Sequence, residues 1–300
     1  MRVGFIGLGI MGKPMARNVM RAGFPLAIYA RHPDRVRELV DAGATLVGAS
    51  AEVARQAEVV VTMLPNAPEV EEVVTGPGGV LEGARPGTIV VDMSTIAPDA
   101  SRRLADTCAV RGVSFLDAPV SGGSIGAERG TLTIMAGGDA EAFATCRPLF
   151  EAMGQPENVF HVGPSGSGEV VKLANNVLCG VIAAANAEAL VLGVKNGVDV
   201  AALAKIIGVS SGANWQLSNV FPARVWDGSF TPGFMTDLLL KDLGLAVELA
   251  GQGGIPVRLT ELTRQMYDET RAAGHGRDDY SSVILQIEEK AGVRVRMPAE

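Results

Sequence analysis

The sequence predicts an α/β domain with a doubly wound parallel sheet, followed by a domain built only of helices. Short β-rich runs alternate with helical patterns over roughly the first 160 residues, which is typical of parallel strands joined by crossover helices. The run Val-Val-Val at 59–61 is apolar without alternation, as expected for a strand buried on both faces of such a sheet. Strand signals stop at about Gly163, so the remainder is expected to be helical.

The strands of the first domain are expected where β-branched and aliphatic residues cluster between turn residues. They cover residues 3–6, 26–30, 45–47, 59–63, 88–92, 114–117 and 131–136. Helices are expected in the intervening segments, where apolar residues recur at helical spacing. They cover residues 11–22, 33–42, 50–57, 67–75, 97–111 and 139–151.

We place the domain boundary so that the first domain is 1–163 and the second is 164–300. The stretch 163–168 is rich in glycine and serine and is expected to be a loop. The second domain begins with a long interdomain helix at 169–193. The other helices are expected at 199–208, 214–225, 236–251, 256–273 and 280–290.

Composition excludes several classes of function. The 300 residues carry a net charge of −7 without long basic runs, which disfavours nucleic-acid and anionic-membrane partners. Three scattered cysteines and three histidines give no metal-ligand spacing, so we expect no metal site, reduced thiols and a cytoplasmic location. The most apolar stretch, 177–194, contains Asn186 and Glu188 and makes a poor membrane span.

A glycine pattern directly follows the first expected strand and opens the first helix. Gly7, Gly9 and Gly12 are joined by Leu8, Ile10 and Met11. Gly7 allows a tight turn, Gly9 lets the main chain approach a pyrophosphate, and Gly12 allows close contact between helix and strand. Because the helix start also supplies amide donors, the pattern predicts a Rossmann-type dinucleotide-binding domain.

Arg31 follows the second expected strand, where an NAD-preferring domain usually has a carboxylate for the ribose 2′-hydroxyl. An arginine can instead pair with a 2′-phosphate. We therefore favour NADP over NAD as the cofactor; the alternative is that Arg31 is a solvated side chain.

Lys172 lies near the start of the long apolar helix. Apolar residues surround it at helical spacing, which predicts a core helix. A buried ammonium is costly without compensation, and Asn175 and Asn176 lie three and four residues further along the same face. The alternative is a lysine that extends out of the first turn into solvent.

The expected strand ends at Met63, Asp92 and Asp117 lie where a doubly wound sheet presents its ligand crevice. Ser121, Gly122 and Gly123 follow closely and offer unobstructed amides that suit an anion, although the same residues also make an ordinary turn.

Four ordered blocks resemble the β-hydroxyacid dehydrogenases, which include 3-hydroxyisobutyrate dehydrogenases and tartronate semialdehyde (2-hydroxy-3-oxopropionate) reductases. The resemblance spans residues 4 to about 250. The blocks are GFIGLGIMGKPMA at 4–16, DAPVSGG at 117–123, GSG at 166–168 with Lys172, Asn175 and Asn176, and KDLGLA at 241–246. One departure is Ala30-Arg31-His32, where NADP-using members often have Asn-Arg-Thr.

The resemblance implies roles for individual residues. Lys172 would be the catalytic acid/base and Asn176 would hold the substrate. Residues 121–123 would bind the substrate carboxylate. The cofactor contacts would come from Met63, Leu64, Pro65, Thr95 and Lys241 in addition to the glycine turn, although Lys241 alone also suits a solvated charge.

These observations predict an NAD(P)-dependent oxidoreductase that interconverts a small 3-hydroxy acid and its 3-oxo acid or semialdehyde. Lys172 would protonate the developing alkoxide in one direction and accept the hydroxyl proton in the other. Two alternatives are an imine reductase and a non-catalytic dinucleotide-binding module. We also expect a homodimer or homotetramer, because the apolar helix at 169–193 usually needs a partner to complete its burial.

Overall fold

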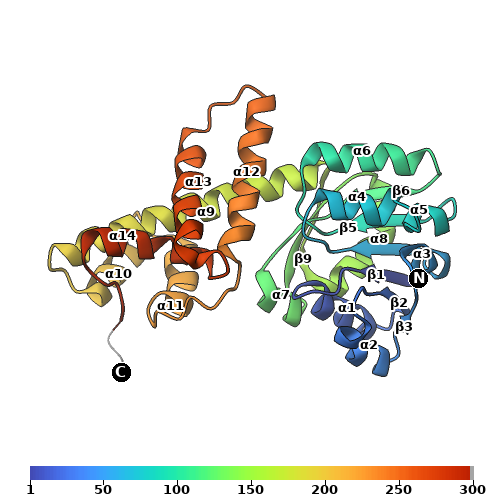
Figure 1. The fold of residues 1–300 in the computed structure, drawn as a ribbon, viewed down its shortest axis with the longest axis horizontal. Coiled ribbons are helices and arrows are strands. Elements are labelled where there is room, and N and C mark those ends of the chain that lie inside the picture. Colours follow the sequence, from blue (N-terminus) through green and yellow to red (C-terminus); the bar gives the residue numbers. More distant parts are fainter. Residues whose placement is uncertain (298–300) are drawn as a thin grey trace. The chain divides into compact units, whose positions relative to one another are not determined.

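The computed structural model describes residues 1–297 and divides the chain into two compact units, Met1–Lys172 and Leu173–Glu300 (Figure 1). The first unit contains the sheet. The regular elements among the described residues of the second are all helices.

Six parallel strands form most of the sheet, and they lie in the order β3-β2-β1-β4-β5-β6. Their bounds are β1 Val3–Ile6, β2 Leu26–Tyr29, β3 Thr45–Leu46, β4 Val59–Thr62, β5 Ile89–Asp92 and β6 Ser114–Asp117. The chain extends one way from β1 to β3 and the other way from β4, so the strand order reverses between β1 and β4. Ligands of doubly wound sheets bind outside the carboxyl ends of the strands at such a point.

The far end of the sheet differs from the expected all-parallel arrangement. β8 (Leu132–Gly137) pairs antiparallel with β6 and with the two-residue strand β7 (Val120–Ser121). β9 (Gly154–Gly163) then pairs parallel with β8 through two register shifts. The sequence did not predict β7 or β9, because β7 is too short to show a pattern and the start of β9 contains glycine, proline and polar residues that favour turns.

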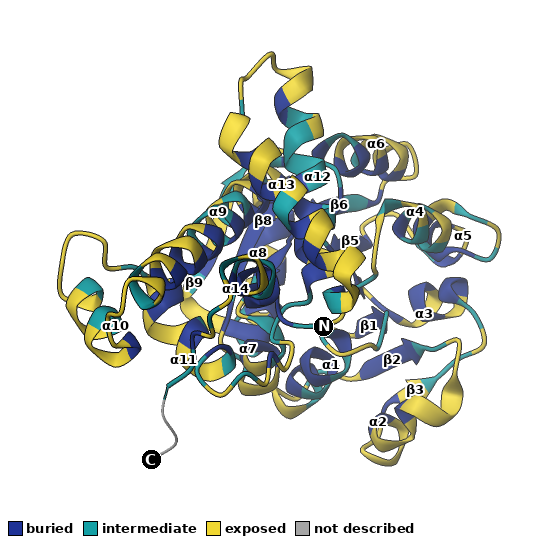
Figure 2. Ribbon diagram, turned by 60° about the vertical axis from the view of Figure 1, so that its left-hand side comes forward, coloured by how far each residue is buried: buried dark blue, intermediate teal, exposed yellow. Residues whose placement is uncertain are grey.

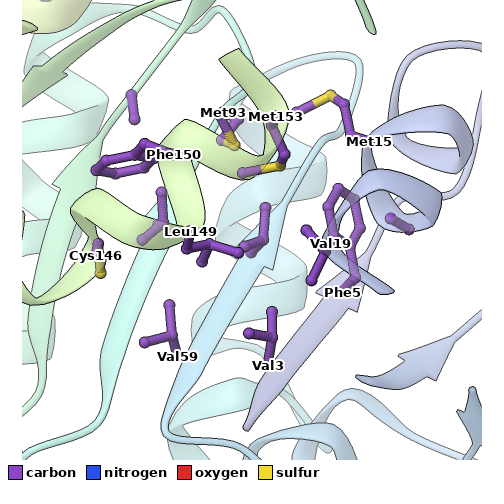
Figure 3. Packing of buried hydrophobic residues seen from close by; sticks show 14 of the residues in the cluster. Val3, Phe5, Met15, Val19, Val59, Met93, Cys146, Leu149, Phe150 and Met153 are labelled. Atoms are coloured by element: carbon purple, nitrogen blue, oxygen red, sulfur yellow. The ribbon is translucent and has the colours of Figure 1, made fainter. Parts of the chain in front are cut away.

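Helices cover both faces of the sheet. On one face, α1 (Gly12–Arg21) and α8 (Ala140–Met153) direct side chains such as Val19 and Leu149 toward the sheet (Figure 3). On the other face, α3 (Ser50–Gln56), α4 (Ala67–Thr75) and α6 (Pro98–Ala109) pack against alternate strand residues. Full burial of each large aliphatic side chain contributes about 1.5–3 kcal/mol, so both faces stabilise the sheet.

Shorter helices complete the first unit. The segment predicted as one helix at 33–42 is a 3-10 turn, Pro33–Val36, followed by α2 (Arg37–Asp41). The short helices α5 (Val80–Gly83) and α7 (Gly123–Arg129) were not predicted, because neither completes enough turns to show an apolar period.

The second unit packs its helices around buried aromatic and aliphatic side chains, among them Phe221, Leu243 and Tyr267. The helices are α9 (Ser167–Lys195, which begins in the first unit), α10 (Val200–Gly208), α11 (Phe221–Arg224), α12 (Thr236–Gln252), α13 (Arg258–Thr270) and α14 (Val283–Ala291). A π-helical turn, Gln216–Val220, interrupts the segment predicted as a continuous helix at 214–225. A second, Arg271–His275, follows α13 at the end of the segment predicted at 256–273 and contains Gly274 with φ 98°.

Helix α9 is not the fully buried core helix that the sequence predicted. Leu178 and Leu192 are 58% and 68% exposed, and Val170 and Val171 are also exposed (Figure 2). The buried side instead contains Lys172, Asn176 and small aliphatic residues. By length and composition α9 could cross a membrane, but core helices of soluble proteins pass the same test, and 39% of its most apolar window is buried.

Candidate active site

The carboxyl ends of four strands lie side by side at one edge of the sheet. The register pairs Ile6 with Thr62, Thr62 with Asp92, and Asp92 with Asp117. The loops that follow these strands therefore leave the sheet at the same level. They contain the glycine turn, the 63–65 segment, Thr95 and the 118–123 segment.

The three glycines of the turn differ in what surrounds them. Gly7 has φ 96°, and a Cβ atom there would lie 2.2 Å from the carbonyl oxygen of Met63. A Cβ atom on Gly12 would lie 1.9 Å from the carbonyl oxygen of Gly7, whereas one on Gly9 would meet nothing within 4 Å. Gly7 and Gly12 are thus required by the fold itself, and Gly9 leaves open the space that a dinucleotide pyrophosphate fits.

The remaining residues of the turn point in different directions. Leu8 and Met11 pack partly against the core of the sheet, while Ile10 is 68% exposed. Helix α1 has no acidic residue in its first turn, so nothing there opposes a bound anion. The turn therefore fits the diphosphate of NAD or NADP.

Arg31 lies two residues beyond Tyr29, which pairs with Ile6 at the end of β1. Its side chain is exposed, and within residues 1–297 it makes no ion pair or side-chain hydrogen bond. The position beside the glycine turn suits a contact with the adenosine ribose or its phosphate.

A hydrogen-bonded network joins the loops after β4 and β5. The backbone amide of Leu64 donates to Ser94 Oγ at 2.8 Å, and Ser94 Oγ donates to Asp92 Oδ1 at 2.5 Å. Thr62 Oγ1 donates to the same carboxylate oxygen at 2.7 Å. The segments that contain Met63, Leu64, Pro65 and Thr95 are therefore held together, and Ser94 and Thr62 are participants that the sequence did not identify.

Asp92 is fully buried, and burial raises its pKa from 3.8 to about 6, against the lowering effect of the Ser94 and Thr62 hydrogen bonds. A carboxyl group with a raised folded-state pKa stabilises the fold while it is protonated, and this contribution is lost as the pH rises through about 6.

An asparagine side chain at this position cannot ionise. The quantity to follow is the unfolding free energy of Asp92→Asn minus that of wild type, measured in urea titrations. As the pH rises from about 4 to about 7, this difference should increase by about 2–3 kcal/mol, because only wild type loses the contribution. A difference that is independent of pH would contradict this assignment.

Ser121, Gly122 and Gly123 lie where β7 passes into α7. Gly122 and Gly123 have φ values of 127° and 59°, conformations that strain other residues. The segment follows Asp117 by only four residues, so it starts from the same edge of the sheet.

Asp117 connects this edge to the start of α9. Its carboxylate is 0% exposed and accepts hydrogen bonds from the backbone amides of Gly166 at 2.7 Å and Glu169 at 3.2 Å. Burial raises the pKa of Asp117, and these amides oppose the rise. A Cβ atom on Gly168 would lie 2.2 Å from the carbonyl oxygen of Met135, so the start of α9 lies directly against the sheet.

Lys172 lies just beyond this anchored start and is 7% exposed. The side chain is therefore buried as the sequence predicted, and the alternative of a lysine extended into solvent is wrong.

Asn176 and Lys241 lie in the second unit, and both contact the carboxylate of Asp242. The sequence did not identify Asp242 as a site residue. Asn176 donates to Asp242 Oδ2 at 2.6 Å and accepts from Asn175 at 3.0 Å. Lys241 lies 3.1 Å from Asp242 Oδ1. A carboxylate next to a lysine in a helix usually signals a surface pair, and the 2% exposure of Asp242 could not be read from the sequence.

The chain is similar to known dehydrogenases over almost its whole length. Residues 2–163 match the NAD binding domain of 6-phosphogluconate dehydrogenase, and residues 166–287 match the NAD-binding domain of NADP-dependent 3-hydroxyisobutyrate dehydrogenase. The 2-(hydroxymethyl)glutarate dehydrogenase of Eubacterium barkeri is 42% identical over 98% of this chain and 97% of its own. The NAD-dependent L-serine dehydrogenase of Pseudomonas aeruginosa is 42% identical over 94% of this chain and 96% of its own.

Among solved structures, 3-hydroxyisobutyrate dehydrogenase of Mycobacterium tuberculosis, with L-serine, superposes with a TM-score of 0.88. It is 33% identical, and the match covers 96% of this chain and 99% of that one. The fold and the glycine turn define a dinucleotide-binding protein. The chain belongs to the β-hydroxyacid dehydrogenase family and is an NAD(P)-dependent dehydrogenase of hydroxy acids.

Proposed function

We propose that the protein reversibly oxidises a small 3-hydroxy acid to the corresponding 3-oxo acid or semialdehyde, with NADP favoured over NAD and Lys172 as general acid/base. The burial of Lys172, at 7% exposed, carries the proposal. A lysine ammonium is rarely buried without a specific role.

The names of the similar enzymes narrow the substrate class. 3-Hydroxyisobutyrate, 2-(hydroxymethyl)glutarate and L-serine are all substrates with a hydroxymethyl group on the carbon next to a carboxylate, and they differ in the third substituent of that carbon. The shared part requires an anion site and a proton acceptor at a fixed separation. Ser121, Gly122 and Gly123 would supply the first, and Lys172 the second.

When it is bound, the nicotinamide supplies or accepts the hydride. The residues of this chain hold and orient the reactants. Lys172 donates a proton to the substrate oxygen during reduction and removes it during oxidation. Asn176 would bind the substrate, and the 7–12 turn, Arg31, residues 63–65, Thr95 and Lys241 would hold the cofactor.

A panel of substrates tests the proposal. The protein is incubated with 3-hydroxyisobutyrate, 2-(hydroxymethyl)glutarate, L-serine and 3-hydroxypropionate, each with NADP⁺ and with NAD⁺. In the reducing direction, tartronate and succinic semialdehydes are compared with cyclic imines. We expect turnover of at least one 3-hydroxy acid, faster with NADP⁺ because of Arg31. Turnover of imines alone would support the imine reductase alternative, and binding without turnover would support the non-catalytic one.

We also infer that the protein forms a homodimer or homotetramer and that it is located in the cytoplasm. The exposed aliphatic side chains of α9, including Leu178 and Leu192, form a row along one helix, and such rows are usually covered by a partner. Cys108 and Cys146 are buried thiols outside any disulfide, which suits a reducing compartment.

The assembly is tested by sedimentation velocity at micromolar concentration. We expect a species of at least two chains in wild type and a smaller one in Leu178→Glu, because an interfacial carboxylate is costly to bury. A wild-type sample that sediments only as a monomer would contradict the proposal.

A further inference from the structure

We infer that Asp117 is a positioning residue, whose buried carboxylate fixes the start of α9 and so sets the place of Lys172 relative to the 121–123 segment. The inference deepens the proposed function and rests on it. Its evidence is a carboxylate that the reaction itself does not use.

Both oxygens of this carboxylate bind the backbone that leads into α9. Oδ1 accepts from the Gly166 amide at 2.7 Å, and Oδ2 accepts from the Glu169 amide at 3.2 Å. These amides belong to the first turn of the helix and the loop before it, where backbone donors have no partner within the helix. Asp117 therefore caps α9 from a neighbouring strand, 49 and 52 residues away in sequence.

Close main-chain packing leaves little freedom around this cap. A Cβ atom on Gly137 would lie 2.8 Å from both Asp117 carboxylate oxygens. A Cβ atom on Gly168 would lie 2.7 Å from the carbonyl oxygen of Asp117 and 2.2 Å from that of Met135. The helix start is thus held against β6 and β8 by main-chain atoms, which cannot change rotamer.

The Glu169 amide, which Asp117 holds, is close in sequence to Lys172. Lys172 follows Glu169 by three residues, which is less than one helical turn and a rise of about 4.5 Å. A shift or tilt at the capped end is therefore passed to Lys172 by the rigid helix. In reactions of this kind, a displacement of about 1 Å can reduce the rate about 100-fold.

Asp117 also lies at the start of the segment that leads to the proposed carboxylate site at residues 121–123. Asp117 ends β6, and Ala118, Pro119 and Val120 lead from it to Ser121. The amide of Ala118 is bonded to the Asp92 carbonyl at 2.7 Å, so this connection begins from a fixed point. Asp117 consequently joins the proposed carboxylate site to the proposed proton donor through two short, restrained paths.

The chemistry of the cap requires two acceptors. An asparagine offers one oxygen and one NH₂ group, and its NH₂ group would face one of the two backbone donors. Asp117→Asn should therefore lose one of the two hydrogen bonds and release the helix start while keeping the size of the side chain.

Asp139 provides a matched control in the same unit. Its side chain caps α8 and accepts from the amides of Glu141 at 3.0 Å and Ala142 at 2.9 Å. Helix α8 contains no proposed site residue. Asp139→Ala should lower the melting temperature through the lost cap and leave kcat unchanged.

The experiment compares wild type, Asp117→Asn, Asp139→Ala, Lys172→Ala and the Asp117→Asn/Lys172→Ala double variant, using the best substrate and cofactor. We expect Asp117→Asn to lower kcat at least about tenfold with the cofactor KM within about twofold. In the Lys172→Ala background the same substitution should have no further effect on kcat, because it acts through that lysine.

Three results would overturn the inference: kcat of Asp117→Asn within about twofold of wild type, an equal loss of kcat in Asp139→Ala, or a full further loss in the double variant. If Asp117→Asn does not fold, Asp117→Glu replaces it, because it keeps both acceptors and displaces the helix start. Lys172→Ala separates the two proposals. If it remains active, the proposed role of Lys172 fails, whereas normal activity in Asp117→Asn alone refutes only the positioning role.

Discussion

Lys172→Ala is expected to lower kcat by about 10²–10⁴-fold while the dissociation constant of the cofactor changes little. General acid–base help by a positioned side chain contributes about this much, and alanine can neither donate nor accept the proton. The side chain does not belong to the glycine turn or the 63–65 loop, so cofactor binding should persist. Steady-state kinetics give kcat, and the fluorescence of the reduced nicotinamide gives the affinity.

Two further variants make this result specific. Lys172→Arg keeps a positive charge but cannot release its proton near neutral pH, so it should be as inactive as Lys172→Ala. Lys205→Ala removes an exposed lysine of α10 and should leave kcat unchanged. The role of Lys172 is wrong if Lys172→Ala retains more than about a tenth of wild-type turnover.

Gly9→Val is expected to weaken cofactor binding by about 10- to 100-fold without destabilising the fold. A side chain at Gly9 meets nothing within 4 Å in the protein, so the folded chain tolerates it. The same space is where a pyrophosphate would approach the main chain, and overpacking there costs about 1–3 kcal/mol. Fluorescence titration with NADPH measures the binding, and thermal unfolding measures the stability.

Gly251→Val is the matched control, because Gly251 also has open space around its Cβ position and lies in α12 of the second unit. It should leave the dissociation constant of NADPH unchanged. If Gly9→Val binds NADPH as tightly as wild type, the cofactor does not lie against this turn.

The sequence predicted strands correctly where the local residue pattern favours a strand and the strand is also buried in the fold. β1, β4 and β5 consist mostly of aliphatic or aromatic residues, and their bounds agree with the expected ones to within a residue. The glycine turn was also recognisable, because its function depends on the order of a few residues along the chain. β9 was not predicted, because tertiary pairing with β8 overrides the weak strand propensity of its first residues.

The sequence identified candidate site residues, but it could not show which of them contact one another. Asp92 and Asp117 were placed correctly at strand ends, yet their partners Thr62 and Gly166 lie 30 and 49 residues away in sequence. Helix α9 shows the same limit. A helix that is apolar on every side has no preferred face, so its pattern could not show that Leu178 is exposed.

Transfer of deuterium from the cofactor tests the central claim most directly. NADPH that carries deuterium at both hydrogen positions of nicotinamide C4 is incubated with the protein and the 3-oxo acid that reacts fastest, and the product is examined by NMR and mass spectrometry. Hydride transfer predicts deuterium on the carbon that bears the new hydroxyl group and none exchanged from water. Reduced product that lacks deuterium at this carbon would contradict the account.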